Sequence, residues 1–146
     1  MSPRRVSRQT KPSLSVPEPP VAEEADDEPV IRVCEIVLEG DVLPFRRWLF
    51  GLRDVAARTR ILMRIDRIIT SGNFGDHRER IQNAVSELRI DYGPGYRVYY
   101  VRHGNLLVIF LGGGTKDGQQ SDIESVVDLW NKVKSDVERY TRDFIP

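Results

Sequence analysis

The residues of this sequence best suited to chemistry on a phosphate are two arginines, a lysine and a set of tyrosines. Arg89 and Arg97 flank a Tyr-Gly-Pro-Gly turn at 92–95, and Lys116 follows three consecutive glycines. The planar fork of arginine grips two phosphate oxygens at once, whereas lysine supplies a compact charge. A nearby tyrosine such as Tyr99 can stack on a base. These residue types together favour a surface that binds RNA.

The elements that must position these residues form an antiparallel meander. We expect its strands at Val85–Ile90, Tyr96–Arg102 and Leu106–Leu111, joined by turns at 92–95 and 103–105. The alternation of apolar residues predicts that Arg89 lies opposite Tyr99 and that Asp91 lies opposite Arg97. Arg89, Arg97 and Tyr99 would then share the face away from the helices, with Lys116 at its rim.

The rest of the pattern predicts a small α+β domain. Val30–Leu38 reads as a first strand, and a short helix follows it that carries Phe45 and Trp48 on its apolar face. Asp54 caps a second helix that ends at Gly72, and a polar loop covers 71–84. A closing helix runs from Ser121 or Asp122 to about Tyr140. The expected order is β-α-α-β-β-β-α, with helices packed on a mostly antiparallel sheet.

The composition changes at Pro29 and divides the chain in two. Residues 1–29, the tail, contain four basic and six acidic residues, many prolines and few large apolar ones, which predicts disorder. Residues 30–146 have the apolar content of one compact domain. With Cys34 as the single cysteine, an intramolecular disulfide and a cysteine-based zinc site are excluded. We expect a soluble, cytoplasmic protein with no membrane segment.

Positive charge is concentrated between residues 46 and 80. This stretch contains nine arginines against four acidic residues. Such an excess could attract RNA or an acidic protein segment, and it is also what the solvated faces of two helices would show. The charge pattern leaves both interpretations open.

Several motifs together resemble the RelE/ParE superfamily of toxins from type II toxin–antitoxin modules. Within it they are most similar to the HigB-like group, the phage-derived addiction module killer proteins. The resemblance covers roughly residues 31–134. The motifs are Phe45-x-x-Trp48-Leu49, Gly72-Asn73-Phe74-Gly75-Asp76, Val85-Ser86-Glu87-Leu88-Arg89-Ile90, Tyr92-Gly93-Pro94-Gly95-Tyr96-Arg97-Val98-Tyr99-Tyr100, and Gly113-Gly114-Thr115-Lys116 with Gln119 or Gln120 and Asp122-Ile123.

The resemblance implies a RelE-like fold and a ribosome-dependent endoribonuclease that cuts messenger RNA and so inhibits translation and arrests growth. It implies a cognate helix-turn-helix antitoxin as the neutralising partner, with the ribosome and messenger RNA as further partners. Neither a metal nor a cofactor is expected in this chemistry.

The resemblance also implies roles for individual residues. Arg97 would bind the scissile phosphate, and Lys116 would neutralise transition-state charge or donate a proton. Arg89 would be a further phosphate ligand or a structural partner of Glu87 or Asp91, and Tyr99 would join the RNA-binding surface. Where the best-known RelE-type enzymes carry lysines, this chain has Ser86 and Glu87. The general base therefore stays open between Glu87, Tyr99 and His103.

Two functions of other classes remain alternatives. A ParE-like protein would poison DNA gyrase by binding, and a catalytically silent module would only bind the antitoxin. The gyrase poison would tolerate the loss of Arg97 and Lys116 as long as its contact surface survived. The glycines at 112–114 lack the pattern of a nucleotide-triphosphate loop, so such a site is excluded.

Overall fold

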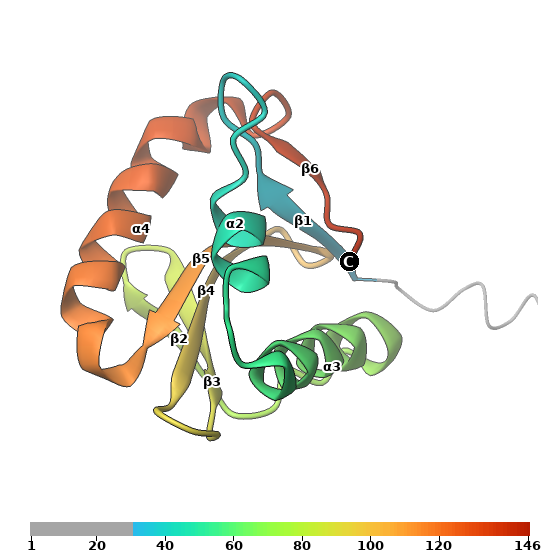
Figure 1. Ribbon diagram of the computed structural model, residues 1–146. Coiled ribbons are helices and arrows are strands. Elements are labelled where there is room, and N and C mark those ends of the chain that lie inside the picture. The colour runs from blue at the N-terminus through green and yellow to red at the C-terminus, as the bar shows by residue number, and fades with distance from the viewer. Residues whose placement is uncertain (1–30) are drawn as a thin grey trace, which may run out of the picture.

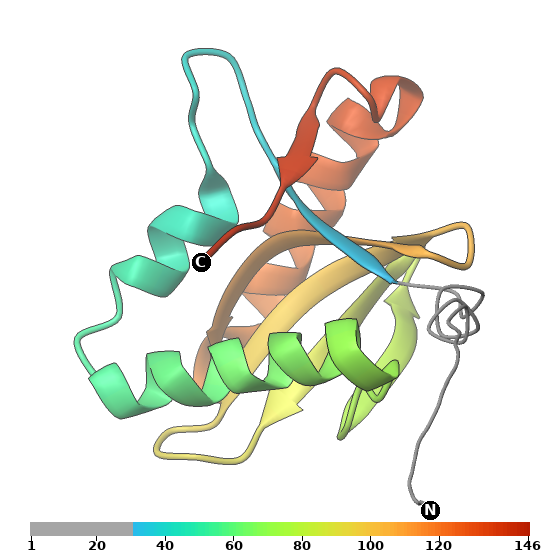
Figure 2. The same cartoon turned by 90° about the vertical axis from the view of Figure 1, so that its right-hand side faces the viewer.

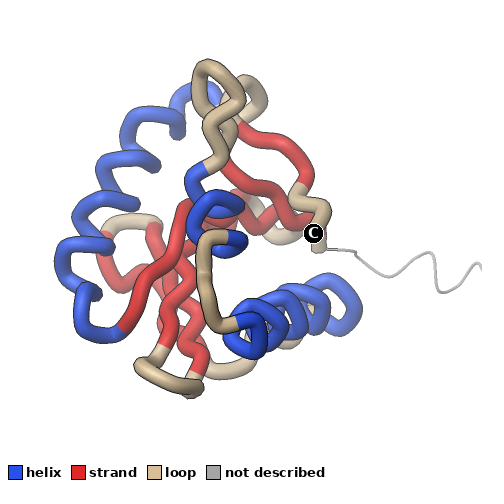
Figure 3. Tube along the Cα trace, in the orientation of Figure 1, coloured by secondary structure: helices blue, strands red, loops and turns tan. Residues whose placement is uncertain are grey.

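A computed structural model describes residues 31–146 (Figures 1 and 3). The predictions for residues 1–29, and for Val30 in the first strand, lie outside these residues. Three α-helices and six strands form an α+β arrangement around a mostly antiparallel sheet. The elements are β1 (Arg32–Ile36), α2 (Pro44–Phe50), α3 (Val55–Ser71), β2 (His77–Gln82), β3 (Val85–Ile90), β4 (Tyr96–His103), β5 (Leu107–Thr115), α4 (Gln119–Val133) and β6 (Thr141–Asp143).

The sheet has helices on both of its faces. Its strand order is β2-β3-β4-β5-β1-β6, and β1 pairs with β5 in parallel while the other pairs are antiparallel. The helices α2 and α3 cover one face and α4 covers the other (Figure 2). Two apolar cores follow, one under α2 and α3 and one under α4. The expectation that Arg89, Arg97 and Tyr99 face away from all helices is therefore wrong, because α4 packs on that side.

Local signals fix the ends of α3. Asp54 precedes the helix in an extended conformation, and its carboxylate accepts a hydrogen bond from the Ala57 amide at 3.2 Å. At the other end Gly72 has a φ of +72°, and its amide donates to the Ile68 carbonyl. Ile61, Ile65 and Ile68 are buried against the sheet. The predicted helix, with its cap and its terminating glycine, is confirmed.

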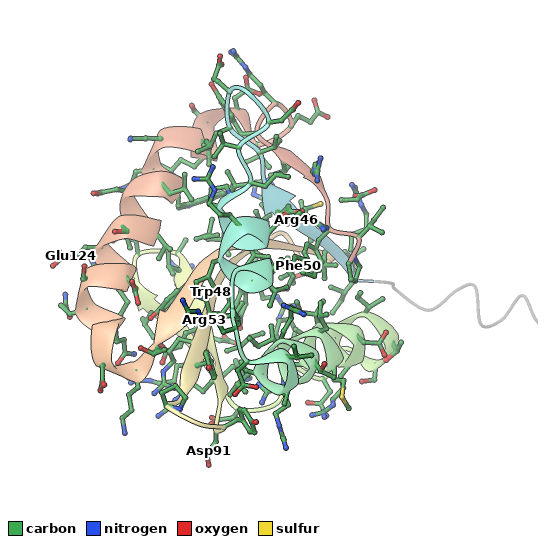
Figure 4. The ribbon with its side chains drawn as sticks, in the orientation of Figure 1. Arg46, Trp48, Phe50, Arg53, Asp91 and Glu124 are labelled. Atoms are coloured by element: carbon green, nitrogen blue, oxygen red, sulfur yellow. The ribbon has the colours of Figure 1, made fainter. Side chains whose placement is uncertain are left out.

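The meander is confirmed, but its first hairpin has a different register. Arg89 lies opposite Arg97, and Glu87 lies opposite Tyr99. The loop between the last paired residues is 91–95, in which Gly93 and Gly95 both adopt positive φ, and Tyr96 lies opposite Ile90. The shift is two residues, so each side chain keeps its predicted face. Asp91 does not pair with Arg97 and instead lies at the tip of the hairpin (Figure 4).

The chain contains two strands that the sequence did not predict. β2 replaces most of the expected polar loop, and its polar residues suit an edge strand whose outer side faces solvent. The closing helix ends at Val133 rather than near Tyr140, and β6 then runs antiparallel to β1. This return places Phe144 in the core, where its ring lies 5.3 Å from Phe45. The free energy gained by burying Phe144 outweighs the tendency of the preceding valines, which are spaced as in a helix, to continue α4.

Three glycines at the end of β5 let helices approach both faces of the sheet. A Cβ atom on Gly113 would lie 2.4 Å from the Trp48 ring of α2, and one on Gly112 would lie 3.3 Å from Val126 of α4. On Gly114, a Cβ atom would lie 1.9 Å from the Asp122 carboxylate. Figure 4 shows Trp48 on α2. The glycine run is a packing device within a strand, and this strand ends directly before Lys116.

Replacing Gly113 with alanine should destabilise the protein by about 1–3 kcal/mol, because the new methyl group overlaps the Trp48 ring. Urea denaturation of both proteins measures the difference. The double variant Gly113→Ala with Trp48→Leu should lose less stability than the sum of the two single changes. Strict additivity would show that the two residues do not compete for this space.

Candidate active site

Glu87 of β3 is the centre of a buried polar cluster on the α4 side of the sheet. The residue is fully buried, and its Oε1 accepts a hydrogen bond from Gln119 Nε2 at 2.8 Å. Arg97 Nε lies 3.8 Å from Oε1, and Arg89 Nε lies 3.9 Å from Oε2. One carboxylate thus faces two guanidinium groups, and this arrangement leaves a net positive charge.

The cluster keeps unused hydrogen-bonding capacity. Among the described residues, Glu87 Oε2, Arg97 Nε and the Tyr99 hydroxyl are buried without a hydrogen-bond partner. Buried polar atoms are usually satisfied, so these three atoms on the neighbouring strands β3 and β4 are an exception. The 3.8 Å separation of Glu87 and Arg97 exceeds a hydrogen bond, so both groups can still bond to a third.

Lys116 lies at the open end of this cluster. Its backbone amide donates to the Gly95 carbonyl at 2.8 Å, which ties the end of β5 to the β3–β4 turn. A Cβ atom placed on Gly95 would lie 3.9 Å from Lys116 Cδ and 4.0 Å from Arg97 Nη1. The two cationic side chains therefore flank the same glycine. Arg89 and Arg97 thus both face Glu87, and Lys116 lies beside Arg97 at Gly95.

Exposure differs among the three cationic residues. Lys116 is exposed, the Arg89 side chain is 37% exposed, and Arg97 is 7% exposed. We expected Arg97 at the surface, and this expectation is wrong because α4 and the glycine run enclose it. Solvent therefore reaches Lys116 and Arg89, whereas Arg97 is almost entirely enclosed.

Tyr99 belongs to the core under α4 and is fully buried. The expectation that it stacks on RNA bases is therefore wrong. Burial raises the pKa of its hydroxyl, and the nearby carboxylates of Glu87 and Asp122 raise this pKa further. The hydroxyl is thus protonated at neutral pH. It can donate a hydrogen bond, but it cannot serve as a base.

His103 is exposed at the other end of β4, where it pairs with Leu107. Six residues separate it from Arg97, which corresponds to about 20 Å along a strand. The structure does not bring His103 into the cluster. Of the three predicted bases, Glu87 alone lies beside both arginines.

Two further residues of the cluster come from the start of α4. Gln119 binds Glu87, and Asp122 places its carboxylate over Gly114 and beside Tyr99. Partial burial raises the pKa of Asp122. Gln119 and Asp122 belong to the motifs that resemble the RelE/ParE superfamily, but the sequence alone indicates no role for them. Their contact with β3 and β5 depends on how α4 packs, which no local pattern reveals.

The chain has a clear relative. An "Uncharacterized protein" from Haemophilus influenzae is 44% identical over 82 residues, which are 56% of this chain and 81% of the relative. This chain belongs to the same family as that protein. Comparisons with protein-family models and with solved structures gave no match. Sequence similarity therefore shows that the two proteins share a family, and the description of the relative names no activity.

No helix among residues 31–146 is long and apolar enough to cross a bilayer. Nor do these residues include a group of three or more histidine, cysteine, aspartate or glutamate side chains that could hold a metal ion.

Replacing Glu87 with glutamine should destabilise the protein by about 3–5 kcal/mol, because it leaves the enclosed Arg97 without its counter-charge. The matched control is Arg89→Gln, which removes the more exposed partner and should cost less than about 1 kcal/mol. Chemical denaturation at neutral pH measures both. Equal losses in the two variants would show that Glu87 does not compensate Arg97.

Proposed function

We propose that this protein is a toxin of the RelE/ParE superfamily, of the HigB-like kind, and that it cleaves messenger RNA. The observation that carries the proposal is that Arg97 and Arg89 face the Glu87 carboxylate, while Lys116 and Arg97 flank Gly95. Two helices after β1, a meander and a helix on the opposite face are consistent with a RelE-like topology. Ribosome dependence and neutralisation by a helix-turn-helix antitoxin are parts of the same proposal.

The reaction needs no group outside the chain and its RNA substrate. The ribose 2′-oxygen attacks the adjacent phosphorus while a base takes its proton. The bond from phosphorus to the 5′-oxygen breaks, and that oxygen takes up a proton. The products are a 2′,3′-cyclic phosphate and a free 5′-hydroxyl.

The cationic residues stabilise the negative charge that develops on the phosphorane-like transition state. Arg97 is held in place by the strands and by Glu87, so its guanidinium edge is already oriented when RNA binds. Lys116 approaches from the solvent side and neutralises charge or protonates the leaving oxygen. Arg89 binds a further phosphate oxygen. One well-placed donor of this kind is worth about 3 kcal/mol, or 10²–10³-fold in rate.

Glu87 is the base in this proposal. Its Oε2 has no hydrogen-bond partner among the described residues and lies 3.9 Å from Arg89. When Arg89 turns toward a bound phosphate, this oxygen becomes accessible to the 2′-hydroxyl. Glu87 would then both orient Arg97 and accept the proton.

Replacing Lys116 with alanine should lower RNA cleavage by about 10²–10³-fold and abolish growth arrest, while the melting temperature stays unchanged because this side chain is exposed. Primer extension across an abundant messenger RNA, before and after induced expression, measures the cleavage. Lys132→Ala, an exposed lysine in the last turn of α4, is the matched control and should cleave like the native protein.

Arg97→Ala is a less suitable test, because it empties an enclosed position and removes one of the two guanidinium groups that face Glu87. Arg97→Lys keeps the positive charge but removes the guanidinium fork. This variant should fold normally but cleave RNA poorly. Growth arrest without new RNA ends would instead favour a gyrase poison. The absence of arrest in the native protein would favour a silent antitoxin-binding module.

A further inference from the structure

A groove runs between the outer face of α3 and the β3–β4 hairpin, on the side of the sheet opposite the Glu87 cluster. Its volume is about 700 Å³. Arginines line one wall and the hairpin forms the other. The main lining residues are Arg60, Met63, Arg64, Arg67, Asp91 and Tyr92.

Three arginines of α3 give the groove a stripe of positive charge. Arg60, Arg64 and Arg67 recur at i, i+4 and i+7, so they lie on one face of the helix, where like charges destabilise it. None of the three forms a salt bridge with a carboxylate among residues 31–146. A helix that keeps such a stripe gains stability from an anionic partner.

Contacts within the fold hold two of these arginines, Arg60 and Arg64, in position. Arg64 donates to the carbonyl oxygens of Phe74, Asp76 and Arg89 at 3.3, 3.1 and 3.0 Å. The Arg60 guanidinium lies 4.4 Å from the centre of the Tyr92 ring, at cation–π distance. Binding an anion in this groove would therefore cost little side-chain entropy.

The chain itself supplies an anionic segment of suitable length. Residues 12–29 contain six acidic residues and no lysine or arginine, and five of these acids lie between Glu23 and Glu28. Ile31 Cδ1 lies 3.7 Å from where a Cβ atom of Gly72 would be, so the chain enters β1 beside the C-terminus of α3.

The distances allow this segment to reach the groove. Residues 23–28 precede Ile31 by three to eight positions, which span up to about 10–26 Å in extended chain. Measured along the helix axis from Gly72, Arg67 is about 8 Å away and Arg60 about 18 Å away. Both arginines are therefore within reach of the acidic residues.

We propose that the acidic segment Glu23–Glu28 binds in this groove, with its carboxylates against Arg60 and Arg67. Tethering gives the segment a local concentration in the millimolar range, so weak ion pairs suffice. The interaction weakens with salt, since the partners are solvent-accessible charges. RNA or an acidic segment of another protein would have to displace the acidic segment to use this face. The inference does not depend on nuclease activity.

Met63 provides a direct reporter of the groove in the full chain. The sequence contains two methionines, Met1 and Met63, so methyl-¹³C-methionine labelling gives two signals. Met63 lines the groove and is 59% exposed. A nitroxide attached to Ala25→Cys would broaden the Met63 signal when the segment is bound. Cys34 is buried, so labelling favours the introduced cysteine.

At 50 mM salt the nitroxide should broaden the Met63 signal at least severalfold more with the native acids than after Glu23→Gln, Glu24→Gln, Asp26→Asn, Asp27→Asn and Glu28→Gln. Salt at 1 M, or Arg60→Gln with Arg67→Gln, should remove the excess. Lys132→Gln with Lys134→Gln, on the other side of the sheet, should not. Equal broadening with native and neutralised acids would reflect tethering alone and overturn the proposal. A Met63 signal that ignores the acidic segment but responds to single-stranded RNA or poly-glutamate would overturn it as well.

Discussion

The buried carboxylate of Glu87 is the interaction on which the candidate site depends. Removing a carboxylate from water is costly, and here the cost is offset by Gln119 from α4 and by the charges of Arg97 and Arg89. Each partner comes from a different position in the fold, so the cluster forms only when the β3–β4 hairpin and α4 are both in place. The same arrangement aims two guanidinium groups at one end of the sheet.

The glycines of β5 make this arrangement possible. Without side chains at Gly113 and Gly114, Trp48 packs on one face and Asp122 on the other. Side chains of α2 and α4 therefore lie close to the sheet at this end of β5, and Lys116 follows directly beside Gly95. Packing and site geometry thus depend on the same short segment. The groove between α3 and the β3–β4 hairpin is connected to the candidate site through β3. Arg64 donates a hydrogen bond to the Arg89 carbonyl, while the Arg89 side chain lies beside Glu87 on the opposite face of the sheet.

The sequence predicted the elements whose signals are local. Asp54 and Gly72 bound α3, and the alternation of apolar residues gave β3 at its observed limits. Elements that depend on distant partners were missed, namely β2 as a polar edge strand and β6, which forms so that Phe144 can be buried. Residue type alone made Arg89, Arg97 and Lys116 candidates, but the burial of Arg97 and Tyr99 under α4 could not be predicted. Nor could the contact of Gln119 with Glu87, which joins residues 32 positions apart.

We propose that these side chains catalyse attack of a ribose 2′-oxygen on its own phosphate. The most direct test is the chemistry of the RNA ends that the purified protein leaves on translating ribosomes. We expect 5′-hydroxyl and 2′,3′-cyclic phosphate ends, and no cleavage when the ribose at the cut site is 2′-deoxy. Cleavage that leaves 5′-phosphate ends, or that proceeds on the 2′-deoxy substrate, would contradict it.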